Sequence, residues 1–199
     1  FADDVVRLCA ALGIARPIVL GQSYGGFVAQ RYLARHPDHP AKVILSSTSH
    51  HMGLARKLAM FERLGGTDAR RAAETFWTDP TAATWADYER VCRPHYNTTQ
   101  PGNDDAKRRT IAVDEILFHT ARHEMPTMQL LPGLKNACCP VLVMAGDADP
   151  VTPIEDAQDI AAALPPQWLQ FERFANVGHG AWRDDADAAF AVLRRFILA

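Results

Sequence analysis

Four short runs rich in apolar residues stand out along the chain, and stretches with helical periodicity separate them. The runs cover residues 17–20, 42–46, 140–144 and 168–174; the first three are almost continuously apolar, and the last includes Gln170, Glu172 and Arg173. Apolar residues that do not alternate with polar ones are typical of strands buried on both faces, as in a parallel sheet covered by helices. Apolar positions at helical spacing predict helices over residues 1–12, 27–36, 152–164 and 186–198. The pattern therefore predicts an α/β fold.

The helix after the third apolar run has a start signal of its own. Thr152 is a residue type that caps helices, Pro153 suits the first helical position, and Glu155 completes a capping box. We therefore expect this helix to begin with Thr152 as its N-cap.

Between the second and third apolar runs the pattern changes. Residues 49–137 are mostly helix-like, charged and rich in His, Arg and Met, with breaks at Gly65-Gly66, Pro80 and Pro101-Gly102. No strand-like run there is as apolar as the two runs before it. We predict a core made of residues 1–48 and 138–199, into which a helical cap of residues 49–137 is inserted.

Length and charge narrow the possible functions. The 199 residues suit one domain, and 21 Lys and Arg against 23 Asp and Glu give a net charge of −2. This balance excludes nucleic-acid binding by bulk positive charge and an acidic disordered tail. The apolar runs are far shorter than the roughly 20 residues that span a bilayer. We expect a small molecule or a short peptide as substrate, and neither nucleic acid nor membrane as partner.

The cysteines indicate a reducing compartment. Cys9, Cys92, Cys138 and Cys139 show no zinc-type spacing, and a disulfide between the two adjacent ones would be strained. We expect free thiols and a cytoplasmic protein. The tripeptide Asn97-Thr98-Thr99 fits an N-glycosylation acceptor, but such tripeptides often arise by chance.

The strongest chemical signal is Gly21-Gln22-Ser23-Tyr24-Gly25, a G-x-S-x-G motif between the first apolar run and the helix that follows it. At a sharp strand-to-helix turn a nucleophile sits in strained backbone, and the flanking glycines make room for it. We expect Ser23 to be the nucleophile and the backbone N–H of Tyr24 to donate to the developing oxyanion.

A serine hydroxyl needs a base, and His179 has the best setting of the eight histidines. It follows the last apolar run directly, in Val177-Gly178-His179-Gly180, where small neighbours leave space around the ring. A carboxylate must then orient the imidazole. Asp147 and Asp149, after the third apolar run, are the two candidates, and the order Ser, Asp, His is that of α/β-hydrolases.

With these motifs the sequence resembles α/β-hydrolase-fold serine hydrolases, and among them the proline iminopeptidase-like group. The resemblance covers the whole chain and is weakest in the cap. In that family the acid is the Asp of a G-x-x-D-P-x-x-P run, which residues 146–153 fit with Asp149, leaving Asp147 a structural role. Ser23 matches the family's nucleophile, which separates the chain from dehalogenase-like and epoxide-hydrolase-like relatives that use Asp there.

The resemblance also implies that the insertion, residues 49–137, is the family's cap, which excludes water and lines the substrate pocket. Cap glutamates of proline iminopeptidases hold the substrate's free α-amino group, and Glu124 lies where one such residue is expected. Glu74 and Glu115 are weaker candidates, and a solvated helix charge is the plainer interpretation of Glu124. His119 and His123 fall on one helix face but lack an evident third ligand, so we expect no metal.

These residues predict a serine hydrolase that cleaves an ester or amide through an acyl-enzyme without a cofactor. The favoured activity is that of a proline iminopeptidase-like aminopeptidase, and the alternative is a small-molecule esterase, lactonase or C–C-bond hydrolase. A non-catalytic, ligand-binding hydrolase-fold protein or an inactive fragment is the alternative of another class. One feature favours this non-catalytic alternative: the sequence before Ser23 has no H-G-G-type run, which in the family supplies a second oxyanion donor.

The resemblance also predicts how much of the family's sheet this chain contains. The family's sheet has about eight strands, and the four runs correspond to its second half. Residues 17–20 are then an uncovered hydrophobic edge, which natural sheets avoid and which offers a surface for self-association. We therefore expect the N-terminal half of the sheet to be absent from this chain.

Overall fold

A parallel sheet of four strands forms the centre of the molecule. The computed structural model describes residues 1–99 and 114–199, with side chains in the second range from residue 118 onward. β1 (Ile18–Gln22), β2 (Lys42–Ser46), β3 (Val141–Gly146) and β4 (Leu169–Phe174) pair in that order. The register aligns Val19 with Val43, Val43 with Val141, and Val141 with Leu169. The α/β fold with a mostly parallel sheet is thus confirmed.

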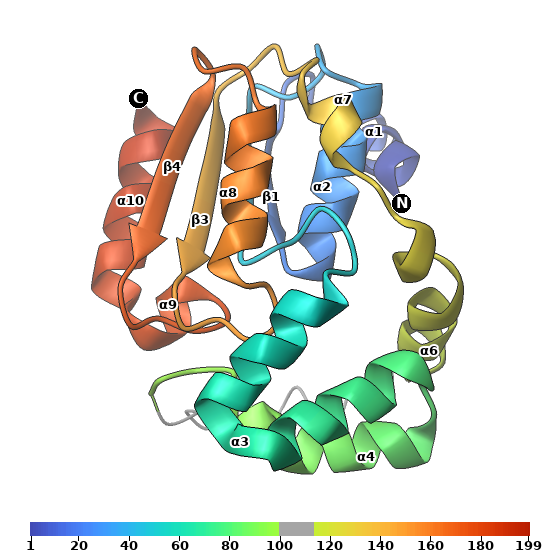
Figure 1. Cartoon of the computed structure of the whole chain (residues 1–199). Coiled ribbons are helices and arrows are strands. Elements are labelled where there is room, and N and C mark those ends of the chain that lie inside the picture. The colour runs from blue at the N-terminus through green and yellow to red at the C-terminus, as the bar shows by residue number, and fades with distance from the viewer. Residues whose placement is uncertain (100–113) are drawn as a thin grey trace.

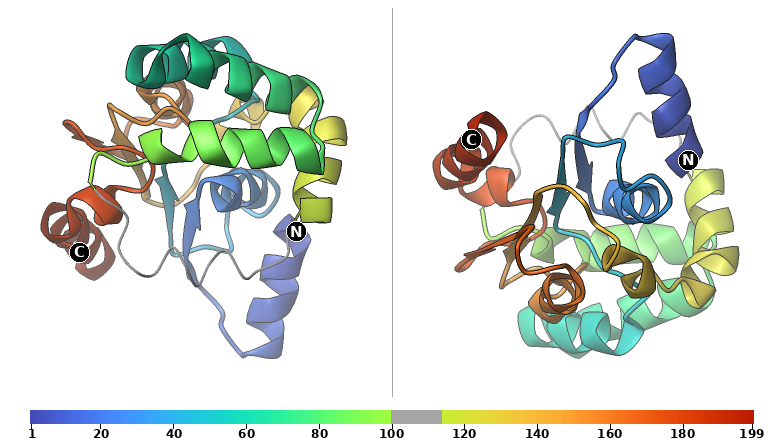
Figure 2. Two further views of the ribbon diagram at one scale, coloured as in Figure 1. Left: turned by 90° about the horizontal axis from the view of Figure 1, so that it is seen from below. Right: turned by 90° about the horizontal axis from the view of Figure 1, so that it is seen from above.

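Helices cover both faces of this sheet (Figures 1 and 2). On one face lie α2 (Tyr24–Arg35), α7 (Leu131–Leu134) and α8 (Ile154–Ala163), which share an apolar core with the strands. On the other face α9 (Ala181–Asp184) and α10 (Ala186–Leu198) pack on side chains of β2, β3 and β4. Alternate residues of β2 and β3 point into these two cores, so the middle of β2 and nearly all of β3 are apolar.

The first helix buries only part of its apolar face. α1 (Ala2–Ala11) packs against α2 and ends before Gly13, whose φ of 68° suits glycine. Its buried residues are Ala2 and Cys9, whereas Leu8 and Leu12 are 61% and 63% exposed. Ile18 and Leu20 of β1 are 42% and 45% exposed; they align with Lys42 and Ile44, on the face of the sheet that α10 packs against, but they are not part of its apolar core. The predicted hydrophobic edge is therefore present.

The insertion lies over the carboxyl ends of the strands (Figure 1). It contains α3 (Leu54–Thr78), α4 (Ala82–Val91), the short helix η1 (Arg93–His95), α6 (Asp114–His123) and the short helix η2 (Met125–Thr127). α3 continues through the predicted break at Gly65-Gly66 with a kink, where Gly66 has φ 70°. Phe61, Phe76 and Tyr88 are fully buried in an aromatic core of its own.

The start of α8 differs from the expectation. Its first residue is Ile154 and its N-cap is Pro153, with no side-chain cap. The Thr152 hydroxyl instead donates to Asp149 Oδ2 at 2.7 Å. Thr152 therefore serves the loop that carries Asp149, and the predicted capping box does not form. Among the helices described, none is long and apolar enough to cross a membrane.

Candidate functional site

Ser23 occupies the turn between β1 and α2 in a conformation that few residues adopt. Its φ of 53° and ψ of −119° lie outside the ordinary regions for a non-glycine residue. The turn is fixed from both sides, because Ser23 N donates to the carbonyls of Ser46 and Ser47 and Ser23 O accepts from Thr48 Oγ1 at 2.8 Å. Backbone strain of this kind, held by surrounding hydrogen bonds, is typical of a functional side chain.

Glycines allow the tight approach of strand and helix at this turn. A Cβ on Gly21 would lie 2.3 Å from the Gly25 carbonyl oxygen, and one on Gly26 would lie 2.3 Å from Thr48 Oγ1. A Cβ on Gly25 would meet nothing within 4 Å. Of the two glycines of the motif, only Gly21 is thus required by close packing, and Gly26, just outside the motif, is required as well.

His179 and Asp149 meet in a buried hydrogen bond. His179 Nδ1 lies 2.9 Å from Asp149 Oδ2, and the two side chains are 6% and 0% exposed. The backbone N–H groups of Val151 and Thr152 donate to the other oxygen of Asp149 at 2.8 and 2.9 Å. Asp147 instead binds Arg173 and the N–H of Asn176 at the surface. Of the two acid candidates, Asp149 is therefore the one beside the histidine.

These contacts determine the charge of the carboxyl group. Burial raises the pKa of Asp149, but the charge and hydrogen bond of His179 and the donors of Thr152 outweigh it, so that the pKa is lowered overall. An ionised Asp149 accepts a hydrogen bond from His179 Nδ1–H, which leaves the lone pair of Nε2 free to take up a proton.

Ser23 and His179 line one cavity of about 340 Å³ between the core and the cap. No group in the described part of the chain holds the Ser23 hydroxyl in a hydrogen bond. The wall contains Tyr24, whose N–H begins α2 beside Ser23. Ser23 and His179 thus line one cavity, and Asp149 is hydrogen-bonded behind His179, at the carboxyl ends of parallel strands, where α/β proteins bind ligands.

A model of the alpha/beta hydrolase fold matches residues 1–184. The chain belongs to the α/β-hydrolase fold family. No curated protein matches it by sequence.

Solved structures with the same α/β-hydrolase fold carry several activities. The chain is similar to a proline iminopeptidase of Mycobacterium smegmatis, with TM-score 0.75 and 21% identity over 98% of this chain and 69% of that one. An esterase of Rhodococcus sp. ECU1013 gives TM-score 0.66 and 24% identity, over 100% and 71%. An enol-lactonase of Burkholderia xenovorans LB400 gives 0.67 and 20%, over 100% and 72%. At these identities the likeness shows the fold alone.

Cap residues that no sequence motif indicates hold the loop of His179 in place through hydrogen bonds and a ring contact. Asn97 Nδ2 donates to the His179 carbonyl and to Asp184 Oδ2, both at 3.2 Å. His179 N donates to the Tyr96 carbonyl at 2.6 Å, and the Tyr96 ring meets the imidazole edge-on at 5.6 Å. From the core, Ser47 Oγ accepts from Gly180 N at 2.9 Å. Asn97, noted in the sequence only as a possible glycosylation acceptor, thus has a structural role.

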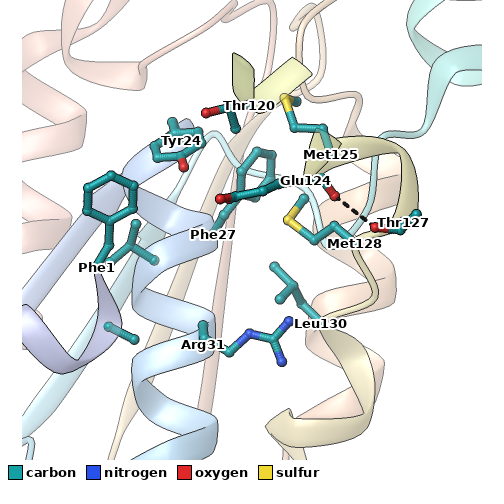
Figure 3. Close-up of a pocket in the computed structure, with 12 residues that line it drawn as sticks. Phe1, Tyr24, Phe27, Arg31, Thr120, Glu124, Met125, Thr127, Met128 and Leu130 are labelled. Carbon is teal, nitrogen blue, oxygen red and sulfur yellow. Dashed lines mark hydrogen bonds between the residues drawn. The ribbon is translucent and has the colours of Figure 1, made fainter. Parts of the chain in front are cut away.

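Glu124 lies in a neighbouring cavity. That cavity has a volume of about 360 Å³ and is lined by Glu124, Arg31 and Phe1 among others (Figure 3). Tyr24, Phe27 and Met125 line both cavities and so form the wall between them. Glu124 is therefore close to the site but is not among the residues around Ser23. Glu74 is exposed on α3 and lines neither cavity, and the Glu115 side chain lies outside the described side chains.

The structure also shows which groups resemble metal ligands. The rings of His119 and His123 lie 4.6 Å apart, and the side chains described offer them no third ligand. His50, His51 and Asp156 do form a group, with ligand atoms within 4.8 Å of one another. Asp156 already accepts from Ser49 Oγ at 2.7 Å and from the Arg56 guanidinium at 2.6 Å.

The group around Asp156 is best explained as an anchor for the cap. Arg56, near the start of α3, also contacts Asp159 of α8 at 2.6 Å. One guanidinium thus contacts two carboxylates of α8, so that a divalent cation at Asp156 would compete with it. The contacts join the first cap helix to the core beside the cavity.

Proposed function

We propose that the chain is a serine hydrolase that cleaves an ester or amide through an acyl-enzyme. The observation that supports this most strongly is the buried His179–Asp149 hydrogen bond in the cavity that Ser23 also lines. An aspartate and a histidine in this order, beside a serine in a strained turn, are the components of nucleophilic acyl transfer.

The chemistry follows from the placement of each group. Ser23 Oγ attacks the carbonyl carbon while His179 Nε2 takes its proton, and Asp149 stabilises the imidazolium that forms. The Tyr24 N–H, at the positive end of α2, stabilises the oxyanion. His179 then gives the proton to the leaving group, and water releases the acyl group from Ser23 by the reverse sequence. None of these steps requires a cofactor.

Two substrate classes fit this chemistry. The first is a short peptide, as for a proline iminopeptidase-like aminopeptidase, with Glu124 binding the free α-amino group across the wall of Tyr24, Phe27 and Met125. The second is a small ester or lactone, which needs no amine-binding carboxylate beside Ser23. Four unpaired cysteines in the structure support a cytoplasmic location for either.

Labelling with a fluorophosphonate tests the nucleophile. We expect the intact protein to be labelled and Ser23→Ala not to be labelled, because the probe requires an activated serine. Ser46→Ala is the matched control, since Ser46 is a fully buried serine on the adjacent strand and its loss is expected to leave labelling intact. Equal labelling of Ser23→Ala and intact protein would contradict the assignment. A folded, intact protein that is never labelled would favour a non-catalytic binding protein.

Two model substrates separate the substrate classes. The aminopeptidase proposal predicts turnover of proline-naphthylamide, with a higher KM in Glu124→Gln. The esterase proposal predicts turnover of p-nitrophenyl acetate alone. If only the acetate is cleaved, the aminopeptidase proposal is lost.

A further inference from the structure

The cavity that contains Ser23 is lined by cationic side chains. Lys57, Arg93 and Arg183 contribute to its wall, and no carboxylate does so among the residues the structure describes. Glu124 lines the neighbouring cavity, and Asp149 is fully buried behind His179. The substrate of this cavity therefore meets cationic side chains on several sides, of which Arg93 already contacts Glu89 at 3.8 Å.

Lys57 is the cation that most needs explanation, because it is 2% exposed. It lies in the first turns of α3, and its ammonium donates to the carbonyl of Val151 in the loop that follows Asp149. This carbonyl is its one hydrogen-bond acceptor within the described part of the chain, and it carries no net charge. Two N–H bonds of the ammonium are therefore left without a protein acceptor.

The nearest carboxylates do not form an ion pair with Lys57. Asp149 accepts from His179, and Asp156 accepts from Arg56 and Ser49. Both act on Lys57 only through space: burial lowers its pKa, their charges offset part of this effect, and the pKa is lowered overall. A buried charge without a close partner is costly, and proteins retain one where a ligand supplies the partner.

We propose that Lys57 binds a carboxylate of the substrate, so that the enzyme prefers esters or lactones whose acyl part bears a negative charge. The inference rests on the proposed function, since it assigns the substrate class of the Ser23 cavity. Trp77, Trp85 and Tyr96 form apolar parts of the same wall and suit the hydrocarbon portion of such a substrate. A cationic substrate is disfavoured there.

Matched esters test the charge preference. The mono-p-nitrophenyl ester of glutaric acid and the p-nitrophenyl ester of pentanoic acid have acyl chains of equal length and differ in one terminal carboxylate. We expect kcat/KM to be higher for the glutaryl ester by about tenfold or more, as for a desolvated charge pair. The trimethylammonio-butanoyl ester is expected to react more slowly than the neutral one. Equal values for all three, or a preference for the cation, would overturn the inference.

Variants assign the preference to Lys57. Lys57→Gln keeps a donor for the Val151 carbonyl and removes the charge, so the ratio of kcat/KM for the glutaryl and pentanoyl esters is expected to fall about tenfold. A merely structural role would lower both values together and leave the ratio unchanged. Lys42→Met is the matched control, because Lys42 also donates to backbone carbonyls, of Phe196 and Ile197, but lies outside the cavity. Its ratio is expected to equal that of the unchanged protein.

A binding measurement separates this inference from the proposed catalysis. In Ser23→Ala, glutarate is expected to quench the fluorescence of Trp77 and Trp85 in a saturable manner, whereas the neutral glutaramide is not. Adding Lys57→Gln is expected to weaken glutarate binding about tenfold. If glutarate and glutaramide behave alike while the intact protein is labelled by fluorophosphonate, the charge subsite is wrong and the hydrolase stands. If glutarate binds and no labelling occurs, the subsite stands and the hydrolase is wrong.

Discussion

At the scale of single residues, the loop that carries Asp149 determines the electrostatics of the site. Val151 and Thr152 donate three hydrogen bonds to the carboxylate, and His179 lies against it in a position without solvent access. Every lone pair that faces the protein is thereby occupied. The carboxylate remains ionised although it is buried, because donors replace the water that it loses.

Replacing Asp149 with Asn tests its role in orienting His179. The introduced amide is uncharged and can present an N–H to His179 Nδ1. The imidazole then loses its preferred tautomer, and the imidazolium loses the negative charge that stabilises it. By analogy with serine proteases, kcat is expected to fall on the order of 10⁴-fold. The measurement is steady-state hydrolysis of a p-nitrophenyl ester. A loss below tenfold would indicate that another acid takes this role.

The same carboxylate predicts a dependence of stability on pH. The pKa of Asp149 is lowered below its ordinary value of 3.8, because His179 and Thr152 outweigh the effect of burial. A depressed pKa stabilises the fold at higher pH, and this contribution is lost as the pH falls through the folded-state pKa. The stability advantage of the unchanged protein over Asp149→Asn, measured by urea unfolding, is therefore expected to shrink below pH 3.8. An advantage that grows there would contradict the charge assignment.

At the scale of elements, the close approach of β1 and α2 depends on the absence of a side chain at Gly21 and Gly26. Gly26 lies against Thr48, which also holds the Ser23 carbonyl, whereas the space beside Gly25 is open. Both glycines belong to the first turn of α2. They form a matched pair, in which the same substitution meets a crowded site and an empty one.

Gly26→Ala and Gly25→Ala are thus expected to differ in stability. The added methyl group at position 26 displaces Thr48 and costs about 1–3 kcal/mol of unfolding free energy, as overpacking does. At position 25 the methyl group meets nothing, and alanine favours a helix by about 0.5–1 kcal/mol over glycine. Urea unfolding of both variants measures the difference. Equal stabilities would show that the approach of Thr48 to the helix is not as close as described.

The cap and the histidine loop form a second junction between elements. Asn97 joins the segment after η1 to His179 and Asp184, so its removal is expected to loosen the imidazole without removing any reacting group. We expect Asn97→Ala to lower kcat about tenfold, as small displacements of reacting groups do. Asn136→Ala, at an exposed position before β3, is the control and is expected to keep kcat. A normal kcat in Asn97→Ala would remove this residue from the positioning of His179.

At the scale of the whole molecule, β1 is the end strand of the sheet, and no described residue forms a strand on its outer side. The order β1-β2-β3-β4 places it at the end, and Ile18 and Leu20 are 42% and 45% exposed. Free N–H and C=O groups beside apolar side chains form a template for pairing with another strand. We propose that two copies of this chain associate through their β1 edges.

Sedimentation velocity over a range of concentrations tests this association. The chain is expected to form dimers whose population rises with concentration, and Leu20→Lys is expected to shift it toward the monomer, since a charge at an edge opposes pairing. Phe190→Lys is the control, because Phe190 is 58% exposed on α10, away from this edge. A monomer at every concentration, or equal dissociation by both variants, would contradict the proposal.

The whole molecule also shows which features the sequence could predict. The strands and the Ser23 turn were predictable because apolar runs and the G-x-S-x-G motif are local signals, and the Asp149 assignment needed the family resemblance as well. The roles of Asn97 and Lys57 depend on how the cap folds back over the strand ends, which no local pattern encodes. Thr152 carried a valid helix-start signal that the buried carboxylate of Asp149 overrode. Leu8 and Leu12 have helical spacing, but none of the elements described between residues 1–99 and 114–199 covers them.

The most direct test of the central claim is to locate the fluorophosphonate adduct by peptide mass spectrometry. Ser46, Ser47 and Ser49 lie close to Ser23 along the adjacent strand and its continuation, so labelling alone does not identify the serine. The tryptic peptide of residues 8–31 contains Ser23 as its only serine. We predict a single adduct, on that peptide. An adduct on the peptide that contains the other three serines, with none on residues 8–31, would contradict the assignment of Ser23 as the nucleophile.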